Sequence, residues 1–469
     1  MQAPQSSTAL YAAREPVFPR SVSGRFRSLK WGLMVVLLGI YYLVPWIRWD
    51  RGPNLPDQAV LVDLAGRRFF FFGIEIWPHE FHFVAGLLVM AGLGLFLFTS
   101  ALGRVWCGFA CPQTVWTDLF TAVERRIEGD RNAQIRLHRA PLDARKLRLR
   151  LAKYAVWLVI AVGTGGAWVF YFADAPTLAG DLFTGQASAT AYAAVAILTA
   201  TTFTFGGFAR EQICIYACPW PRIQGAMMDE DTLAVGYRDW RGEPRGKPRD
   251  PAAGDCVACN ACVSVCPMGI DIRDGQQLAC IGCGLCIDAC DDVMDRLGRD
   301  RGLVGFFALS DATAESAGSA PRPAWAHLVR PRTVLYTALW SLVGIGLVAL
   351  LLGRPEIDAT IAAMRNPTHV LLSDGAVRNT YEVRVRNRGG MDRIFTFSAP
   401  DSPVTLSVEA AANSRARVPA NETGLVKVHA VAPPGSTFSR AERSPLEIVI
   451  SESEGGAQRN LETYFTGNR

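Results

Sequence analysis

The sequence predicts an α-helical membrane protein with a cysteine-rich, ferredoxin-like module and a small C-terminal all-β domain. Three observations carry this prediction. Five long apolar runs lie between residues 31 and 352, eight cysteines repeat at short intervals from 256 to 290, and apolar and polar residues alternate after residue 356. We divide the chain into a polar segment (1–30), a membrane part (31–230), the cysteine-rich module (231–330), a further span (331–354) and the β-domain (355–469).

The composition agrees with a membrane protein that carries soluble parts. Half of the 469 residues are hydrophobic and the mean hydropathy is +0.15, which is unusually apolar for a soluble chain of this length. The net charge of +5 is small, so nothing in the composition favours a nucleic-acid partner.

The apolar runs are long enough to cross a bilayer. About 20 helical residues span the hydrocarbon core, and five runs with few or no charges meet that length. The first is too long and badly flanked for a cleaved signal peptide. The five expected spans are Trp31–Ile47, Phe81–Leu102, Leu151–Ala173, Ala189–Ala209 and Thr333–Leu352.

The loops between these runs differ in charge. Residues 124–153 hold ten Arg and Lys, whereas residues 174–188 hold none. By the positive-inside rule the first loop is cytoplasmic and the second periplasmic. The sequence therefore predicts a bacterial inner-membrane protein with its N-terminus and the segment 210–332 in the cytoplasm, and its C-terminal domain in the periplasm.

The last part of the chain has the pattern of a β-sandwich. Runs such as Tyr381–Asn387, Val404–Glu409 and Leu425–Val431 alternate apolar and polar residues between Gly, Pro, Asn and Asp. This alternation is typical of antiparallel strands with one buried face. No cysteine follows Cys290, so no disulfide links these strands.

The eight clustered cysteines have the spacing of a bacterial two-cluster ferredoxin. Each motif reads C-x-x-C-x-x-C-x-x-x-C, and in this arrangement the fourth cysteine of each motif ligates the other [4Fe–4S] cluster. A pair of structural zinc sites is the main alternative, but such sites usually show two Cys pairs with a longer spacer. The expected ligand sets are Cys256, Cys259, Cys262 and Cys290 for one cluster, and Cys280, Cys283, Cys286 and Cys266 for the other.

The other four cysteines form two C-x-x-x-C-P motifs. Cys107/Cys111 and Cys214/Cys218 each follow the second span of a predicted hairpin, so the first four spans read as two copies of one unit. Residues i and i+4 share a helix face, and Pro112 suits a helix start that leaves Cys111 near its N-terminus. Four soft thiolates suit Cu(I) or zinc. Close helix packing or a redox-active dithiol pair are the alternatives.

A histidine pair precedes the second span. His79 and His82 are three residues apart beside Trp77 and Phe81. They have the chemistry of haem or copper ligands or of quinone contacts. Interfacial anchoring is the more common role of such residues.

With these motifs in view, the sequence resembles the cytochrome c oxidase accessory proteins of the CcoG/FixG/Rdx family. The resemblance rests on the run from Ile213 to Leu233, on Arg241–Gly246, on both cluster motifs and on Arg365-Asn-Pro. Trp220-Pro221 and Phe306-Phe307 depart from the usual family residues. Neither departure touches an expected ligand.

The resemblance implies a function. Family members assist the assembly of cbb3-type oxidase and are thought to reduce Cu(II) to Cu(I) for its copper centre, and their C-terminal domain is immunoglobulin-like. The four C-x-x-x-C-P cysteines then become a catalytic copper site fed by two clusters, with oxidase assembly factors or a copper transporter or chaperone as partners. The electron donor and a homodimer are left open. The alternatives are a quinol dehydrogenase subunit that feeds a periplasmic reductase, and a copper carrier without turnover.

Overall fold

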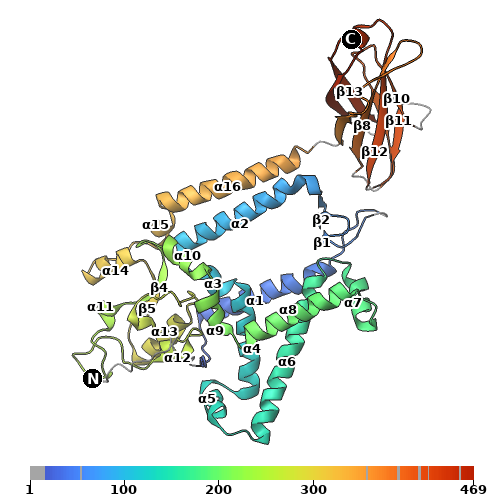
Figure 1. The fold of residues 1–469 in the computed structure, drawn as a ribbon. Helices are drawn as coiled ribbons and strands as arrows, with labels where there is room; N and C mark the ends of the chain where they lie inside the picture. Colours follow the sequence, from blue (N-terminus) through green and yellow to red (C-terminus); the bar gives the residue numbers. More distant parts are fainter. Residues whose placement is uncertain are drawn as a thin grey trace, which may run out of the picture. The chain divides into compact units, whose positions relative to one another are not determined.

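The computed structural model describes residues 16–52, 55–354, 357–387, 391–409, 414–420, 422–453 and 456–468 (Figure 1). The chain forms two compact units. One contains residues 1–47 and 59–347, and the other contains residues 48–58 and 348–469. The first unit holds the twelve cysteines, so it holds every expected metal site.

Within the described residues, five helices are long and apolar enough to cross a membrane, as the sequence predicts. Two of them begin earlier than the apolar runs do, at Arg25 and Ala144, because their first turns are basic. In α1, Arg27 is buried and paired, because its Nη1 lies 2.8 Å from Asp118 Oδ1. The five helices are α1 (Arg25–Leu43), α2 (Phe81–Leu102), α6 (Ala144–Val169), α8 (Ala189–Gly207) and α16 (Pro331–Leu352).

Small residues let these helices approach one another closely. A Cβ on Gly165 of α6 would lie 2.9 Å from the carbonyl oxygen of Val195 in α8. Helices α2 and α16 run side by side (Figure 1), and a Cβ on Gly86 would lie 2.5 Å from Leu347. Glycine contacts of this kind hold helices together in membranes, where burial of apolar surface gives no net gain.

Short elements fill the connections. A three-stranded antiparallel sheet that the sequence analysis did not anticipate lies between α1 and α2. It consists of β1 (Val60–Asp63), β2 (Arg68–Phe71) and β3 (Ile74–Ile76), and η2 (Pro78–Glu80) follows it. The remaining connecting helices are η1 (Val44–Trp46), α3 (Val105–Phe109), α4 (Pro112–Glu128), α5 (Arg131–Arg139), α7 (Ala175–Thr184), α9 (Arg210–Gln212), the π-helical turn η3 (Ile213–Ala217) and α10 (Trp220–Met227).

Part of the basic loop is used inside the fold. Lys153 is only 1% exposed, and its Nζ lies 3.0 Å from Glu124 and 2.9 Å from Glu128. Arg210 reaches the other oxygen of Glu124 at 2.8 Å. Buried charges must be paired in this way to offset their desolvation, so these residues join α4, α6 and the start of α9.

The cysteine-rich module is framed by a two-stranded antiparallel sheet of β4 (Ala234–Tyr237) and β5 (Val304–Phe307). Two helices, α12 (Ala261–Val265) and α13 (Leu285–Leu297), carry the later cysteines of each motif. Asp288 of α13 accepts hydrogen bonds from the backbone N–H groups of Phe26 and Arg27, at 3.2 and 2.8 Å. A carboxylate of the module thus caps the first membrane helix. The shorter elements are α11 (Asp239–Gly242), η4 (Ile272–Asp274), α14 (Leu309–Ser316) and α15 (Ala324–Leu328).

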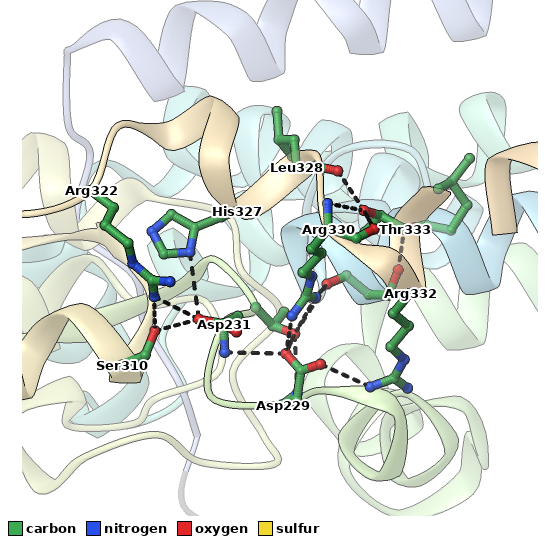
Figure 2. Close-up of polar contacts among 12 residues, drawn as sticks. Asp229, Asp231, Ser310, Arg322, His327, Leu328, Arg330, Arg332 and Thr333 are labelled. Carbon is green, nitrogen blue, oxygen red and sulfur yellow. Dashed lines mark hydrogen bonds and ion pairs between the residues drawn. The ribbon is translucent and has the colours of Figure 1, made fainter. Parts of the chain in front are cut away.

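A polar network connects this module to the start of α16 (Figure 2). His327 Nε2 lies 2.5 Å from Asp311 Oδ2, and Arg322 Nε lies 2.9 Å from the other oxygen of Asp311. Asp229 pairs with Arg330 and with Arg332, the latter at 3.0 Å. The network ties the loop after α10 to the residues that lead into the last membrane helix.

Asp311 is the buried acceptor of this network and gives a prediction about stability. Burial acts to raise its pKa, but hydrogen bonds from Arg322 and His327 outweigh it and lower the pKa. Its carboxylate therefore stabilises the fold above the ordinary carboxyl pKa of about 3.9, and this contribution is lost as the pH falls below that value. We expect Asp311→Asn to cost about 1–3 kcal/mol at pH 7, and less near pH 3.

Thermal unfolding of the detergent-solubilised protein at both pH values measures this effect. Asp295→Asn is the matched control, because Asp295 pairs with Arg301 on the surface and should show no resolvable change. An Asp311→Asn deficit of equal size at pH 3 and pH 7 would argue against the stabilising role of the ionised carboxylate.

The second unit is a sandwich of two antiparallel sheets, with strand orders β10-β12-β8-β6 and β11-β9-β13-β14, and with β7 paired to β8. Their inner faces share one core that includes Tyr381, Phe397 and Ile448, all at most 2% exposed. The strands are β6 (Asp358–Ala363), β7 (Val370–Leu371), β8 (Val377–Arg386), β9 (Arg393–Ser398), β10 (Thr405–Val408), β11 (Arg415–Val418), β12 (Thr423–Ala432), β13 (Ser444–Glu452) and β14 (Gln458–Phe465), with the short helix α17 (Thr437–Arg440) before β13. The predicted β-sandwich is confirmed.

Candidate functional site

The eight cysteines of the module line two adjoining cavities. We call the first the outer cluster site; it is lined by Cys256, Cys259, Cys262 and Cys290. We call the second the inner cluster site; it is lined by Cys266, Cys280, Cys283 and Cys286, and Cys262 borders it too. Each cavity thus draws its fourth cysteine from the other motif. This arrangement supports our ligand assignment, which stays a proposal.

The backbone around both cavities repeats. Ala258 and Asn260 in the first motif have φ of +53° and +55°, and Gly282 and Gly284 have φ of +67° and +71° at the matching positions of the second. Left-handed residues at these positions turn backbone N–H groups inward, and Gly282 N–H donates to Cys280 Sγ at 3.4 Å. Such N–H···S bonds stabilise cluster thiolates, so the cavities fit the [4Fe–4S] clusters.

Burial controls the protonation of the cluster-site cysteines. It raises the pKa of Cys262 to about 11 and that of Cys266 and Cys290 to about 12. Without metal, these thiols are therefore protonated at neutral pH. Iron–sulfur cluster insertion must release their protons.

The two C-x-x-x-C-P motifs do not present their cysteines as the sequence analysis expected. Cys107 lies in α3, but Cys111 is extended, with φ −60° and ψ 128°, and caps α4. Cys214 lies in the turn η3, and Cys218 is extended beyond it. The shared helix face was thus a wrong prediction, because a residue before proline avoids the α conformation. Pro112 does begin α4, as predicted.

The four cysteines of these motifs, which we call the thiol site, nevertheless lie near one another. Burial, and then the charges of the other three thiols, raise the pKa of Cys214 to about 12. Burial raises the pKa of Cys107 to about 11, and its thiol donates to Gln224 Oε1 at 3.0 Å. Gln224 is fully buried and also donates to Thr99. In the described part of the chain, no three Cys, His, Asp or Glu side chains are already arranged around a single metal ion.

The thiol site packs directly against the inner cluster site. A Cβ on Gly108 would lie 2.9 Å from the backbone nitrogen and Cα of Cys283 and 2.8 Å from the carbonyl oxygen of Ile281. Cys107 shares one buried apolar cluster with Cys283, and Cys214, Cys266 and Cys286 border this cluster. The chain thus places two groups of sulfurs, far apart in sequence, on either side of a single backbone contact.

Gly108 gives a direct test of this contact. The extra methyl group of Gly108→Ala must push α3 away from Cys283, so we expect a loss of about 1–3 kcal/mol in stability. The control is Gly92→Ala in α2, where a Cβ meets nothing within 4 Å. Thermal unfolding of the two variants measures the effect. Equal behaviour of the two variants would refute the tight contact.

The histidine pair differs from the cysteine sites in its exposure to solvent. His79 and His82 are both exposed, and the His82 ring lies 4.4 Å from the ring of Phe83. Among the residues that the structure describes, no third Cys, His, Asp or Glu side chain joins them to form a metal site.

Family profiles match segments that contain all twelve cysteines of the first unit, and they also match the second unit. One described as a 4Fe-4S dicluster domain matches residues 209–308, and one described as a 4Fe-4S binding domain matches residues 82–129. A third, described as the IG-like fold at the C-terminal of FixG, matches residues 347–468. With the five apolar helices, these matches define a membrane-embedded iron–sulfur electron-transfer protein that carries an immunoglobulin-like domain.

Full-length relatives narrow the class. Protein RdxB of Cereibacter sphaeroides is 61% identical to this chain, over 100% of this chain and 99% of its own length. Protein RdxA of the same organism is also 61% identical, over 99% of this chain and 100% of its own length. The nitrogen fixation protein FixG of Rhizobium meliloti is 53% identical over 96% of this chain and 92% of its own. The chain belongs to the FixG/Rdx family. A solved structure of a FixG-related protein from Vibrio parahaemolyticus aligns with 25% of the chain and all of that structure at 14% identity, with a TM-score of 0.22.

Some residues of the site were not anticipated from the sequence. Gln224, Gly108 and Asp288 act through contacts with residues more than a hundred positions away in the chain. Only Gly108 had a local signal, because it sits inside a cysteine motif. The partners of all three depend on how the module docks on the helices.

Proposed function

We propose that this protein passes electrons from two [4Fe–4S] clusters to copper at the thiol site, and so reduces Cu(II) to Cu(I) for the copper centre of a cbb3-type cytochrome oxidase. The observation that carries this proposal is the contact of Gly108 with Cys283. This contact joins the inner cluster site to the thiol site, which holds the four cysteines outside the cysteine-rich segment 256–290.

The clusters, when bound, supply one electron each at low potential. In our assignment, Cys256, Cys259, Cys262 and Cys290 hold one, and Cys266, Cys280, Cys283 and Cys286 hold the other. Met268, Ile281 and Leu285 share a buried apolar cluster with Cys107 and Cys283 and are at most 6% exposed. They exclude water from the route between the inner cluster site and the thiol site. Each Cu(II) takes one electron, so a fully reduced protein reduces two copper ions.

The order of the route follows from exposure. Cys259 of the outer cluster site is the only exposed cysteine, and a surface groove runs past it between Ser21–Ser23 and Arg296. The inner cluster site borders the thiol site. We therefore place electron entry at Cys259 and exit at Cys283.

The thiol site suits copper as a substrate rather than as a fixed ligand set. Its four sulfurs are soft donors that favour Cu(I), and they are neighbours without being arranged around one ion. Binding requires loss of protons and rotation of side chains, so reduction and capture by sulfur are coupled. Copper that is a substrate must leave the site again, so it does not need a fixed set of ligands.

The cellular setting belongs to the same proposal. We place the module and the N-terminus in the cytoplasm of a bacterial inner membrane and residues 355–469 in the periplasm, following the positive-inside rule. Oxidase assembly factors or a copper transporter or chaperone would take up the product. The domain limits of the sequence analysis and a homodimer also stay proposals.

A second candidate for the thiol site is a third iron–sulfur cluster. The profile described as a 4Fe-4S binding domain covers residues 82–129, which contain only Cys107 and Cys111. Two thiolates do not complete the four-ligand set of a cubane, so such a cluster would also need Cys214 and Cys218. The two candidates differ in metal content.

Metal analysis together with an activity assay tests the function. We expect about eight iron atoms per chain. We also expect protein that has been reduced with dithionite and then desalted to reduce Cu(II), with a Cu(I) chelator as reporter. About twelve iron atoms per chain would favour the third cluster. Oxidation of quinol without reduction of copper would favour the quinol dehydrogenase alternative.

A further inference from the structure

One buried cation lies between the thiol site and the inner cluster site. Arg104 precedes α3 and is only 7% exposed. A Cβ on Gly282 would lie 3.2 Å from the carbonyl carbon of Arg104, so its backbone presses on the loop between Cys280 and Cys283. Its Nη1 donates to the carbonyl oxygen of Leu278, two residues before Cys280.

The charge of this guanidinium has no carboxylate partner. No Asp or Glu in the described residues lies within 4.0 Å of Arg104, and its Nε is buried without a hydrogen-bond partner. A buried cation in this state is costly unless an anion is supplied. The groups around it that become anionic are the sulfurs: burial raises the pKa of Cys107, Cys214 and Cys280, and the charge of Arg104 acts in the opposite direction on all three.

The outer cluster site differs in this respect. Its cation is Arg273, which lines the cavity beside Cys256 and Cys262. Asp271 neutralises it: the carboxylate accepts from Arg273 Nε at 2.8 Å and from Nη2 at 2.6 Å. The inner cluster site therefore faces a free positive charge, whereas the outer site faces a paired one.

We propose that Arg104 is a positioning residue for electron transfer, which supplies the counter-charge of the inner cluster and makes it the higher-potential cluster of the two. A reduced cluster carries one more negative charge than an oxidised one, so a nearby buried cation favours reduction. Electrons then run downhill from the outer to the inner site. The same charge favours Cu(I) over Cu(II) at the thiol site, because copper loses a positive charge on reduction. This inference rests on the proposed function for its direction of flow.

The test is a redox titration of the two clusters followed by EPR, without copper. We expect Arg104→Gln to lower the midpoint potential of the inner cluster alone. The expected fall is ~59 mV, which for one electron is a tenfold change in the ratio of reduced to oxidised cluster at a given potential. Arg104→Lys keeps the charge and should retain most of the potential. Arg296→Gln removes an exposed charge beside the outer site, and solvent screening should leave both potentials unchanged.

Iron content and Arg104→Lys guard against misfolding of Arg104→Gln. If Arg104→Gln binds about eight iron atoms per chain and Arg104→Lys retains the wild-type potential, the lowered potential comes from the lost charge and not from a damaged site. An unchanged potential in Arg104→Gln with full iron content, or a fall in Arg104→Lys as large as that in Arg104→Gln, would overturn the inference. Because no copper is added, a failure of cupric reduction would leave this result standing, and the reverse also holds.

Discussion

We expect the double replacement Cys214→Ala and Cys218→Ala to abolish reduction of Cu(II) while both iron–sulfur clusters remain. The thiol site would keep only Cys107 and Cys111, so it would lose half of its soft sulfur ligands for Cu(I). Loss of outer-shell groups alone typically costs 10–100-fold, so we expect a fall of more than about 100-fold. Neither cysteine lines a cluster cavity, so the iron content should stay at about eight atoms per chain.

The matched control is Tyr216→Phe. Tyr216 lies in η3 between the two cysteines with an exposed side chain, so this change alters the same turn without removing a sulfur. It should leave the rate within about twofold. Cupric reduction that survives in the double variant would remove copper from the thiol site, and loss of iron in that variant would support a third cluster there.

The second large effect concerns the crossed ligand sets. Cys266 lies in the first motif but lines the inner cavity, and Cys290 lies in the second motif but lines the outer one. We expect Cys266→Ala to remove the inner cluster and Cys290→Ala to remove the outer one, each with loss of about half of the iron. EPR spectra of the two variants should then add up to that of the wild type.

The two variants should also differ in function. Cys266→Ala loses the cluster beside the thiol site, so it should not reduce Cu(II) after it has been reduced with dithionite and desalted. Cys290→Ala keeps that cluster, so after the same treatment it should still reduce one Cu(II) per chain. The same EPR signal lost in both variants, or equal activity in both, would contradict the crossed assignment.

Local sequence patterns predict many elements of this fold. Phe81–Leu102 is both the predicted span and the observed α2, because apolar length alone decides it. The spacing of the eight cysteines of the module predicts the crossed ligand sets that we propose, because the fourth cysteine of each motif ligates the other cluster in this type of motif. The strands of the C-terminal sandwich follow from alternation, as β12 does with its buried Val426, Val428 and Ala430.

Other features depend on contacts that spacing does not encode. Cys107 and Cys111 looked like helix neighbours until Pro112 set the backbone of Cys111. The sheet β1–β3 is built from strands of three or four residues, too short for alternation to stand out. Arg104 carries no local mark of burial, and the docking of the loop around Gly282 buries it.

The central claim is that electrons pass from the inner cluster site to copper at the thiol site. The most direct measurement is an anaerobic titration of the dithionite-reduced, desalted protein with Cu(II), in which EPR follows the clusters and a chelator counts Cu(I). We expect two Cu(I) to form per chain as both clusters are oxidised, with copper retained by the wild type and not by the Cys214→Ala, Cys218→Ala variant. Clusters that stay reduced while Cu(II) binds would contradict the account.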